Sequence, residues 1–194
     1  MKYDVILAGV GGQGVLSVAA IIAASAVTEG LAVRQSEVHG MAQRGGAVLA
    51  HLRLSNGVIA GDLVPRGGAD LVVSMEPLES LRYAQWLSPE GVLVSAAEPF
   101  INIPDYPEIG EVIRAIRAFP VSRIVRAASL AREAGLAKAV NMVMVGAASA
   151  FLPLKSETLQ DAIEAAFASK KDAAEANIRA FKSGRNAADE QGRE

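Results

Sequence analysis

The sequence predicts an α/β fold in which a Rossmann-like, mostly parallel sheet is flanked by helices, with a β-hairpin insertion and a helical C-terminal part. Short apolar runs rich in valine and isoleucine end at glycines, which is typical of buried parallel strands. Apolar residues at helical spacing follow these runs, and an Asn-Gly turn interrupts the alternation of strand and helix. With 194 residues, the chain is long enough to bury the core of one such domain.

The first elements are a buried strand over 3–8 and a helix over 15–28. Gly30 is expected to close this helix in the left-handed conformation, and the alanines of the helix are small enough for close packing on a sheet. A second strand is predicted over 32–38. The alternating segment 47–54 is expected to form a hairpin with 58–64 through the turn Ser55-Asn56-Gly57.

Beyond the hairpin, buried strands are predicted over 71–75 and 92–96, with a helix over 77–87 between them and a proline-spaced surface loop over 99–107. The second half is expected to be mostly helical, over 109–119, 121–134, 138–152, 157–168 and 171–182. One or two of these segments, especially around 112–120, could instead contain a strand. We expect a single domain over 1–185 and a polar, frayed tail over 186–194.

The composition excludes several kinds of site. The sequence has no cysteine, which excludes disulfides, a thiol nucleophile and any iron–sulfur cluster bound by thiolates of this chain. His39 and His51 are the only histidines, and their spacing suggests no metal site. A net charge of -2 gives no long-range attraction for nucleic acid or an anionic membrane, so neither partner is expected. Because 51% of the residues are apolar, we expect a homo-oligomer or heteromer in which a partner covers part of the surface.

The apolar N-terminal stretch could also be a secretion signal, since Lys2 precedes it and Ala24-Ser25-Ala26 resembles a cleavage site. Asp4 and the glycines that break the apolar run argue against this interpretation. No segment supplies the ~20 unbroken apolar residues of a membrane span. The sequence therefore favours a cytoplasmic protein.

The glycine cluster after the first strand matches G-x-G-x-x-G between a predicted strand and a predicted helix. Such a turn brings backbone N–H groups and the positive end of a helix to a pyrophosphate; alternatively, the glycines serve only strand-to-helix packing. The candidate cofactor-binding residues are Gly9, Gly11, Gly12, Gln13 and Gly14. A nicotinamide site would also need an acidic residue at the end of the second strand, and Glu37 comes late for that role and could pair with Arg34 instead.

A second polar segment, EVHGMAQRGG over 37–46, follows the second strand. Arg44, Gly45 and Gly46 are candidate anion-binding residues, because a guanidinium exposed by two glycines can pair with a phosphate or carboxylate. Glu37, His39, Met41 and Gln43 are candidates for an interface or a substrate-side surface. His39 suits either acid–base chemistry or a structural role, and no nucleophile is arranged around it by spacing, so no catalytic residue is assigned.

Together, GVGGQG and SEVHGMAQRGG resemble the gamma-type subunit family of 2-oxoacid:ferredoxin oxidoreductases. The resemblance extends through KAVNMVMVGA over 138–147 and NIRAFKSG over 177–184. Glu37, His39, Met41 and Gln43 make the sequence similar to the beta subunit of the indolepyruvate branch, whereas pyruvate and 2-oxoglutarate members carry a different segment before the R-G-G.

The resemblance implies a complex that decarboxylates an aryl 2-oxoacid to an acyl-CoA and carbon dioxide and passes electrons to ferredoxin. It implies that thiamine diphosphate, magnesium and the 4Fe-4S clusters belong to a large partner subunit, through which ferredoxin is reached, and that this chain is inactive alone. Coenzyme A is the candidate ligand of the glycine turn and the Arg44 segment. Gly61-Asp62 begins like a thiamine-binding motif, but Leu63 takes its third place.

Three alternatives stay open: a gamma subunit for pyruvate or another 2-oxoacid, a free-standing NAD- or FAD-binding Rossmann protein, and a structural subunit with an empty fold.

Overall fold

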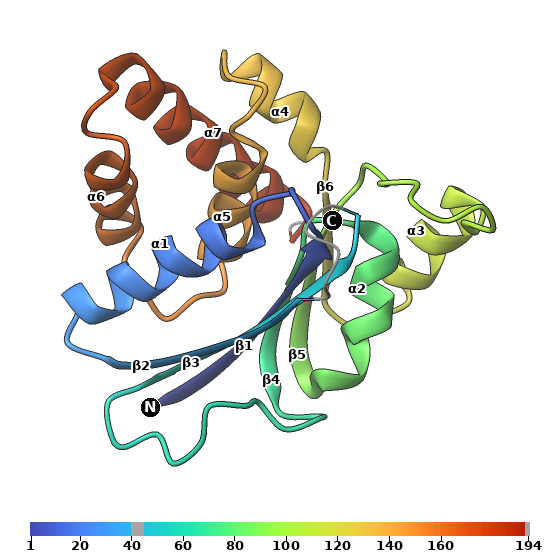
Figure 1. Cartoon of the computed structure of the whole chain (residues 1–194), viewed down its shortest axis with the longest axis horizontal. Coiled ribbons are helices and arrows are strands. Elements are labelled where there is room, and N and C mark those ends of the chain that lie inside the picture. Colours follow the sequence, from blue (N-terminus) through green and yellow to red (C-terminus); the bar gives the residue numbers. More distant parts are fainter. Residues whose placement is uncertain (40–44, 193–194) are drawn as a thin grey trace.

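The computed structural model describes residues 1–39 and 45–192, and within them a mixed sheet lies between two layers of helices (Figure 1). The strands are β1 (Lys2–Val10), β2 (Ala32–His39), β3 (Ala47–Ser55), β4 (Ala69–Ser74), β5 (Leu87–Ala96) and β6 (Ser122–Val125). Their order across the sheet is β2-β3-β1-β4-β5-β6. Among these described strands, β1, β4, β5 and β6 are mutually parallel, whereas β3 is antiparallel to both β1 and β2. The predicted α/β class is confirmed.

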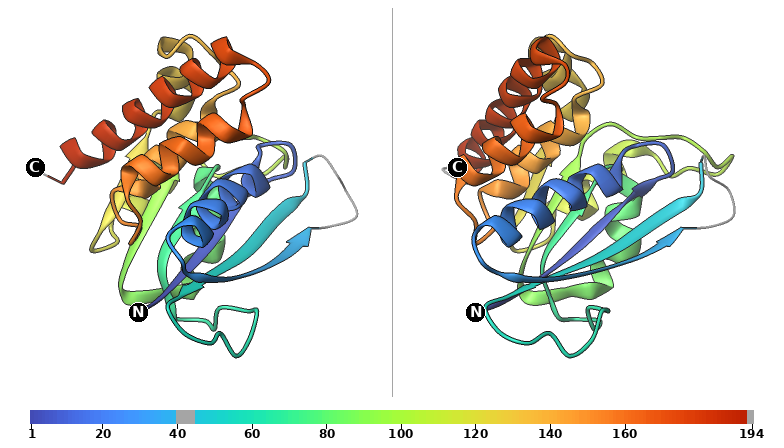
Figure 2. Two further views of the ribbon diagram at one scale, coloured as in Figure 1. Left: turned by 90° about the vertical axis from the view of Figure 1, so that its left-hand side faces the viewer. Right: turned by 60° about the vertical axis from the view of Figure 1, so that its left-hand side comes forward.

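The helices divide between the two faces of the sheet (Figure 2). They are α1 (Val15–Thr28), α2 (Pro77–Tyr83), α3 (Ile109–Arg117), α4 (Ala127–Glu133), α5 (Val140–Ser149), α6 (Ser156–Ala166) and α7 (Lys171–Glu190), with a 3-10 turn over Ala84–Trp86. Helices α1, α5, α6 and α7 contribute to the larger buried cluster, and α2 and α3 pack with a smaller cluster on the opposite face. None of the helices in the described ranges is long and apolar enough to cross a membrane.

The predicted hairpin between 47–54 and 58–64 is wrong, because β3 pairs antiparallel with β2 and β1 and not with residues 58–64. β3 pairs with β2 along one edge and with β1 along the other, so both of its hydrogen-bonding edges are occupied. Residues after Asn56 therefore form a loop, in which the Val58 side chain is 99% exposed. The sheet does contain an antiparallel pair, but it is formed by β2 and β3 and not by β3 and the segment that follows it.

Two further segments in the second half differ from the expectation. The helical prediction over 121–134 misses β6, which is too short to give a periodic signal and forms because β5 offers a free parallel edge. The tail expected to fray over 186–194 is helical to Glu190, and Ala188 is 1% exposed. The Gln191 side chain accepts from Ile124 N (3.0 Å) and donates to Ile124 O (2.8 Å), which satisfies the outer edge of β6.

Helices α5 and α7 pack with their backbones in close contact, because each has a glycine at the crossing. A Cβ on Gly146 would lie 1.9 Å from Phe181 O, and one on Gly184 would lie 1.9 Å from Val143 O. The two helix backbones therefore approach too closely at these glycines to leave room for even a methyl group. The two motifs at 138–147 and 177–184 therefore hold this helix pair together.

We predict that Gly184→Ala lowers the free energy of unfolding, although alanine favours helix in isolation. The added Cβ must push α7 from α5 at a cost of about 2 kcal/mol, which corresponds to a decrease in Tm of roughly 5 °C. Thermal unfolding followed by circular dichroism measures the change. Lys182→Ala, on the exposed side of α7, is the matched control. An unchanged Tm for Gly184→Ala would contradict the packing argument.

His51 is a structural residue of β3 that binds the β3–β4 loop. It is 4% exposed, and its Nδ1 accepts a hydrogen bond from Val64 N (3.1 Å), so this nitrogen carries no proton. Burial lowers the pKa of His51, and the nearby Arg53 guanidinium lowers it further. The unfolded chain therefore binds a proton that the folded chain does not accept at the same pH.

We predict that the contribution of His51 to the free energy of unfolding is fully present above about pH 6.5. It decreases as the pH falls through the unfolded-state pKa of the imidazole. In His51→Asn, Oδ1 can still accept from Val64 N but does not titrate, so the fall between pH 6.5 and 5 becomes shallower. Urea unfolding at several pH values tests this. Parallel pH profiles for the two proteins would rule out His51 as the source of the loss.

Candidate functional site

The β1–α1 turn, residues 11–14, lies at the carboxyl end of the parallel strands. β1 bonds with β4 on one side, and the helices that follow these two strands, α1 and α2, lie on opposite faces of the sheet. Ligands of open α/β sheets bind in the crevice that such a change of direction creates. The turn leads directly into α1, whose first residue is Val15.

The glycines of the motif have different structural roles. Gly14 precedes α1 at φ 80°, in the left-handed region that favours glycine, and its carbonyl accepts from Ser17 N and Val18 N. Gly9 is a packing position, since a Cβ there would lie 2.8 Å from Val15 Cγ2. Gly12, at φ 102°, has open space beside it and faces the cavity described below. The motif therefore serves both strand-to-helix packing and an exposed turn.

Gln13 ties the turn to two strand ends. Its Oε1 accepts from Val10 N (2.8 Å), and its Nε2 donates to Met75 O (3.2 Å) at the end of β4. Met75 N in turn donates to Ala8 O (2.9 Å). The Gln13 amide thus ties the β1–α1 turn to the segment that follows β4.

The second polar segment of the sequence returns beside the turn. Gly11 N donates to Gly46 O (2.8 Å), and Gly45 N donates to Gly11 O (3.3 Å). The structure therefore brings the glycines of the two motifs together. Met41, Gln43 and Arg44, together with the side chain of His39, lie outside the described part of the structure.

Glu37 is exposed on β2 and opposes Ala50 of β3. Because β3 separates β2 from β1, Glu37 lies one strand farther from the turn than the ribose-binding acid of a dinucleotide site. Arg34, on the same strand, pairs with Asp62 at 3.5 Å. The geometry therefore gives no support to a nicotinamide site.

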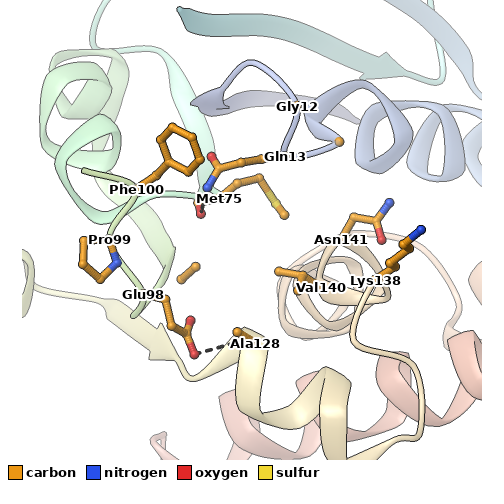
Figure 3. A pocket seen from close by; sticks show the side chains of 12 residues that line it. Gly12, Gln13, Met75, Glu98, Pro99, Phe100, Ala128, Lys138, Val140 and Asn141 are labelled. Atoms are coloured by element: carbon orange, nitrogen blue, oxygen red, sulfur yellow. Dashed lines mark hydrogen bonds between the residues drawn. The ribbon is translucent and has the colours of Figure 1, made fainter. Parts of the chain in front are cut away.

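A cavity of about 530 Å³ opens in front of the turn (Figure 3). Gly12 and Gln13 lie on one side of it, Lys138 and Asn141 on another, and Glu98 and Phe100 on a third. Its full lining is Gly12, Gln13, Gly14, Met75, Ala96, Glu98, Pro99, Phe100, Ala128, Lys138, Val140 and Asn141. The cavity combines residues that are more than one hundred positions apart in sequence.

The cavity has a positive and a negative part. Helices α1 and α5 both begin at its wall, so the positive ends of their dipoles face it, and Lys138 adds a full charge. Opposite them, Glu98 Oε1 accepts from Ala128 N (3.1 Å), while the buried Oε2 has no partner within the described residues. This arrangement suits a ligand with an anionic group and a separate hydrogen-bond donor.

The residues predicted from the sequence do not include Met75, Glu98, Phe100, Lys138 or Asn141, which line the cavity. A topological signal existed for the first three, because residues that follow adjacent parallel strands must meet at one edge. Lys138 and Asn141 had no such signal. They reach the cavity because α5 packs against α1 and β5.

The described residues contain no group of three or more histidine, aspartate or glutamate side chains that could hold a metal ion. Gly61 and Asp62 lie in the β3–β4 loop, away from the cavity lining. The Gly61 carbonyl accepts from Arg53 Nη1 (2.9 Å). The Gly61-Asp62 segment is therefore not part of this cavity.

Comparisons with known proteins show which family and which relatives this chain resembles. The family model described as pyruvate ferredoxin/flavodoxin oxidoreductase matches residues 4–187. A protein of Archaeoglobus fulgidus named indolepyruvate oxidoreductase subunit IorB is 36% identical over 197 residues, covering 97% of this chain and 96% of its own length. The protein of the same name from Methanothermobacter thermautotrophicus is 38% identical, covering 98% of this chain and its own full length (100%).

Two solved structures share the fold. A keto/oxoacid ferredoxin oxidoreductase gamma subunit from Geobacter sulfurreducens is 22% identical with a TM-score of 0.72, covering 96% of this chain and 98% of its own. The 2-oxoglutarate:ferredoxin oxidoreductase of Magnetococcus marinus, solved with 2-oxoglutarate, coenzyme A and succinyl-CoA, is 20% identical with a TM-score of 0.78. This chain is covered to 97% in that comparison but spans only 31% of the longer chain.

We predict that Gln13→Glu destabilises the protein. The carboxylate keeps an acceptor for Val10 N but loses the donor to Met75 O and places negative charge beside that carbonyl, a loss of about 2 kcal/mol. Thermal unfolding at pH 7 measures the effect. Gln85→Glu makes the same chemical change at an exposed glutamine and is expected to leave Tm nearly unchanged; equal Tm values for the two variants would refute the proposed role of the Gln13 amide.

Proposed function

Because the chain belongs to the pyruvate ferredoxin/flavodoxin oxidoreductase family, we propose that it is the small subunit of an indolepyruvate, or aryl 2-oxoacid, ferredoxin oxidoreductase complex. The observation that carries the proposal is the identity of 36–38% to proteins named as this subunit, along nearly the whole of both chains. The complex decarboxylates the oxoacid, forms the acyl-CoA and reduces ferredoxin.

In this proposal, thiamine diphosphate and the 4Fe-4S clusters are held by the large partner subunit. The chain has no cysteine to supply thiolates for a cluster. Its cavity lacks the carboxylate set that would hold magnesium, within the residues that the structure describes. The contribution of this subunit is binding and positioning, and it works in the cytoplasm as part of the heteromer.

The ligand of the cavity is the anionic part of coenzyme A. A pyrophosphate suits the N-terminal ends of α1 and α5, where backbone N–H groups have no intrahelical partner, and Lys138 complements its charge. Glu98 Oε2, which has no partner among the residues that the structure describes, suits a hydroxyl or amide donor of the same ligand. Arg44, which precedes Gly45 in sequence, supplies a further cation from the second motif, and Glu37, His39, Met41 and Gln43 belong to the surface that meets the partner.

The experiment that tests the proposal is co-expression of this chain with the large subunit of such a complex. Purification through a tag on this chain is expected to bring down both subunits and an activity that reduces viologen dye with indolepyruvate and coenzyme A. Neither chain alone is expected to be active. A stable chain that does not bind the large subunit but binds NAD or FAD would support the free-standing alternative. Activity only with another 2-oxoacid would show that the substrate is not an aryl 2-oxoacid.

We predict that Lys138→Met raises the KM of the assembled complex for coenzyme A by roughly tenfold and leaves the KM for the oxoacid unchanged. The reason is that a charge-assisted contact to a phosphate is lost while the packing of the aliphatic stem is kept. Steady-state kinetics measure both constants. Lys182→Met, on exposed α7, serves as the control. Equal effects on both constants would indicate damage to the fold instead.

A further inference from the structure

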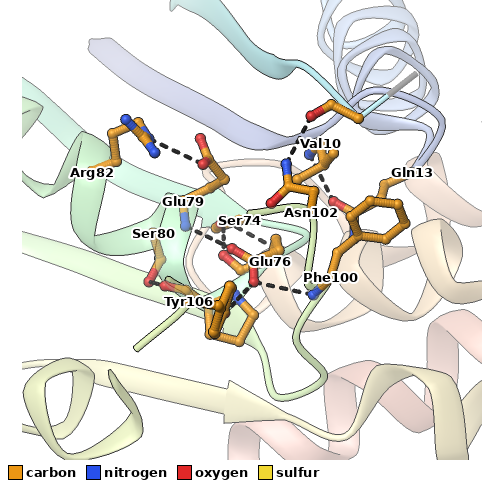
Figure 4. A network of polar contacts seen from close by, with 12 residues as sticks. Val10, Gln13, Ser74, Glu76, Glu79, Ser80, Arg82, Phe100, Asn102 and Tyr106 are labelled. Atoms are coloured by element: carbon orange, nitrogen blue, oxygen red, sulfur yellow. Dashed lines mark hydrogen bonds and ion pairs between the residues drawn. The ribbon is translucent and has the colours of Figure 1, made fainter. Parts of the chain in front are cut away.

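We propose that Glu76 is a positioning residue that holds one wall of the coenzyme A cavity in place from behind; this inference rests on the proposed function for the identity of the ligand. Glu76 follows Met75 at the end of β4 and is 1% exposed. It does not line the cavity. Its carboxylate binds donors from three places in the chain (Figure 4).

The first contacts join α2 to the β5–α3 loop, residues 97–108. Glu76 Oε2 accepts from Glu79 N (2.8 Å) and caps α2. Glu76 Oε1 accepts from Phe100 N (3.2 Å) and from the Tyr106 hydroxyl. Two points of the β5–α3 loop, six residues apart, are therefore bound to one buried oxygen.

Tyr106 is suited to remain a donor. Burial raises its pKa, and the hydrogen bond to Glu76 raises it further, so the phenol keeps its proton across the physiological range. The backbone of Glu76 is also fixed, because Glu76 N donates to Ser74 Oγ (3.3 Å) and the Ser74 hydroxyl donates to Glu76 O (2.6 Å). The carboxylate has little freedom to follow the loop if the loop moves.

The loop that Glu76 holds carries cavity residues and contacts the second motif. Glu98, Pro99 and Phe100 line the cavity. Asn102 Nδ2 donates to Gly45 O (2.7 Å), and Gly45 and Gly46 bond to Gly11 of the β1–α1 turn. Glu76 is thus linked to the turn by hydrogen bonds to Phe100, by the loop backbone from Phe100 to Asn102, and by hydrogen bonds through Gly45.

A carboxylate is required at this position because both of its oxygens accept. In Glu76→Gln, the amide nitrogen must face either the Glu79 N–H or the Phe100 N–H, neither of which can accept, so one of these backbone hydrogen bonds is lost. We expect a rise of roughly tenfold in the KM of the complex for coenzyme A, with kcat changed less than about twofold. Tyr106→Phe removes one donor alone and is expected to give a smaller rise in the same constant.

Glu79→Gln is the matched control. Glu79 is a second buried carboxyl on α2, but its Oε1 binds Arg82, and its Oε2 has no partner in the described part of the chain. Its replacement is expected to leave the KM for coenzyme A unchanged. Asn102→Ala removes only the hydrogen bond to Gly45 O. A rise in the KM for coenzyme A in this variant would show that part of the Glu76 effect passes through the second motif.

Hydrogen exchange of the assembled complex without coenzyme A provides a readout that is independent of activity. Glu76→Gln is expected to increase exchange across 97–108 at least tenfold, and Glu79→Gln is not. Faster exchange with an unchanged KM would overturn the positioning role, and unchanged exchange in Glu76→Gln and Tyr106→Phe would overturn the anchoring itself. A wild-type complex with no response to coenzyme A would refute the proposed function, whereas the exchange data would still decide whether Glu76 fixes the loop.

Discussion

The antiparallel pairing of β3 with β1 is the constraint on which the site depends. The two strands pair over nine positions, from Lys2 with Ser55 to Val10 with Ala47. Because they run in opposite directions, the start of β3 lies beside the end of β1, and Gly45 and Gly46 meet Gly11. A shift of one residue in this register would move every side chain of β3 to the other face and separate the two motifs.

The same pairing explains why the cavity differs from that of a dinucleotide-binding protein. β3 takes the place beside β1 that the second strand has in a Rossmann sheet, so Glu37 lies on the outer strand. The groups near the turn are two helix N-termini, Lys138 and the buried Glu98 oxygen. No acidic side chain at the end of the neighbouring strand is among these described groups to bind the ribose of a redox cofactor. These groups suit recognition of a phosphate-containing substrate more than electron transfer.

Local signals predicted much of the fold. The helix over 15–28 was found with both ends because small apolar residues lie between two glycines that adopt positive φ, Gly14 and Gly30. β6 was not found, since a strand of four residues owes its existence to the free edge of β5. The hairpin prediction was wrong because Asn56-Gly57 is a valid turn signal, yet the strand before it had no edge left to pair.

The candidate site was predictable only where its residues are local in sequence. The glycine turn and Gly45-Gly46 stand out in the sequence, whereas Glu98 and Lys138 acquire a role only when strands and helices are assembled. Glu76 is less conspicuous still, because it acts through the backbone of a loop that begins more than twenty residues later.

A structure of the assembled complex with coenzyme A bound would show whether the β1–α1 turn binds the pyrophosphate. We expect the pyrophosphate to lie within hydrogen-bonding distance of the first N–H groups of α1 and of Lys138 Nζ, with the β5–α3 loop still bound to Glu76. Coenzyme A bound wholly within the large subunit, with no contact to the β1–α1 turn, would contradict it.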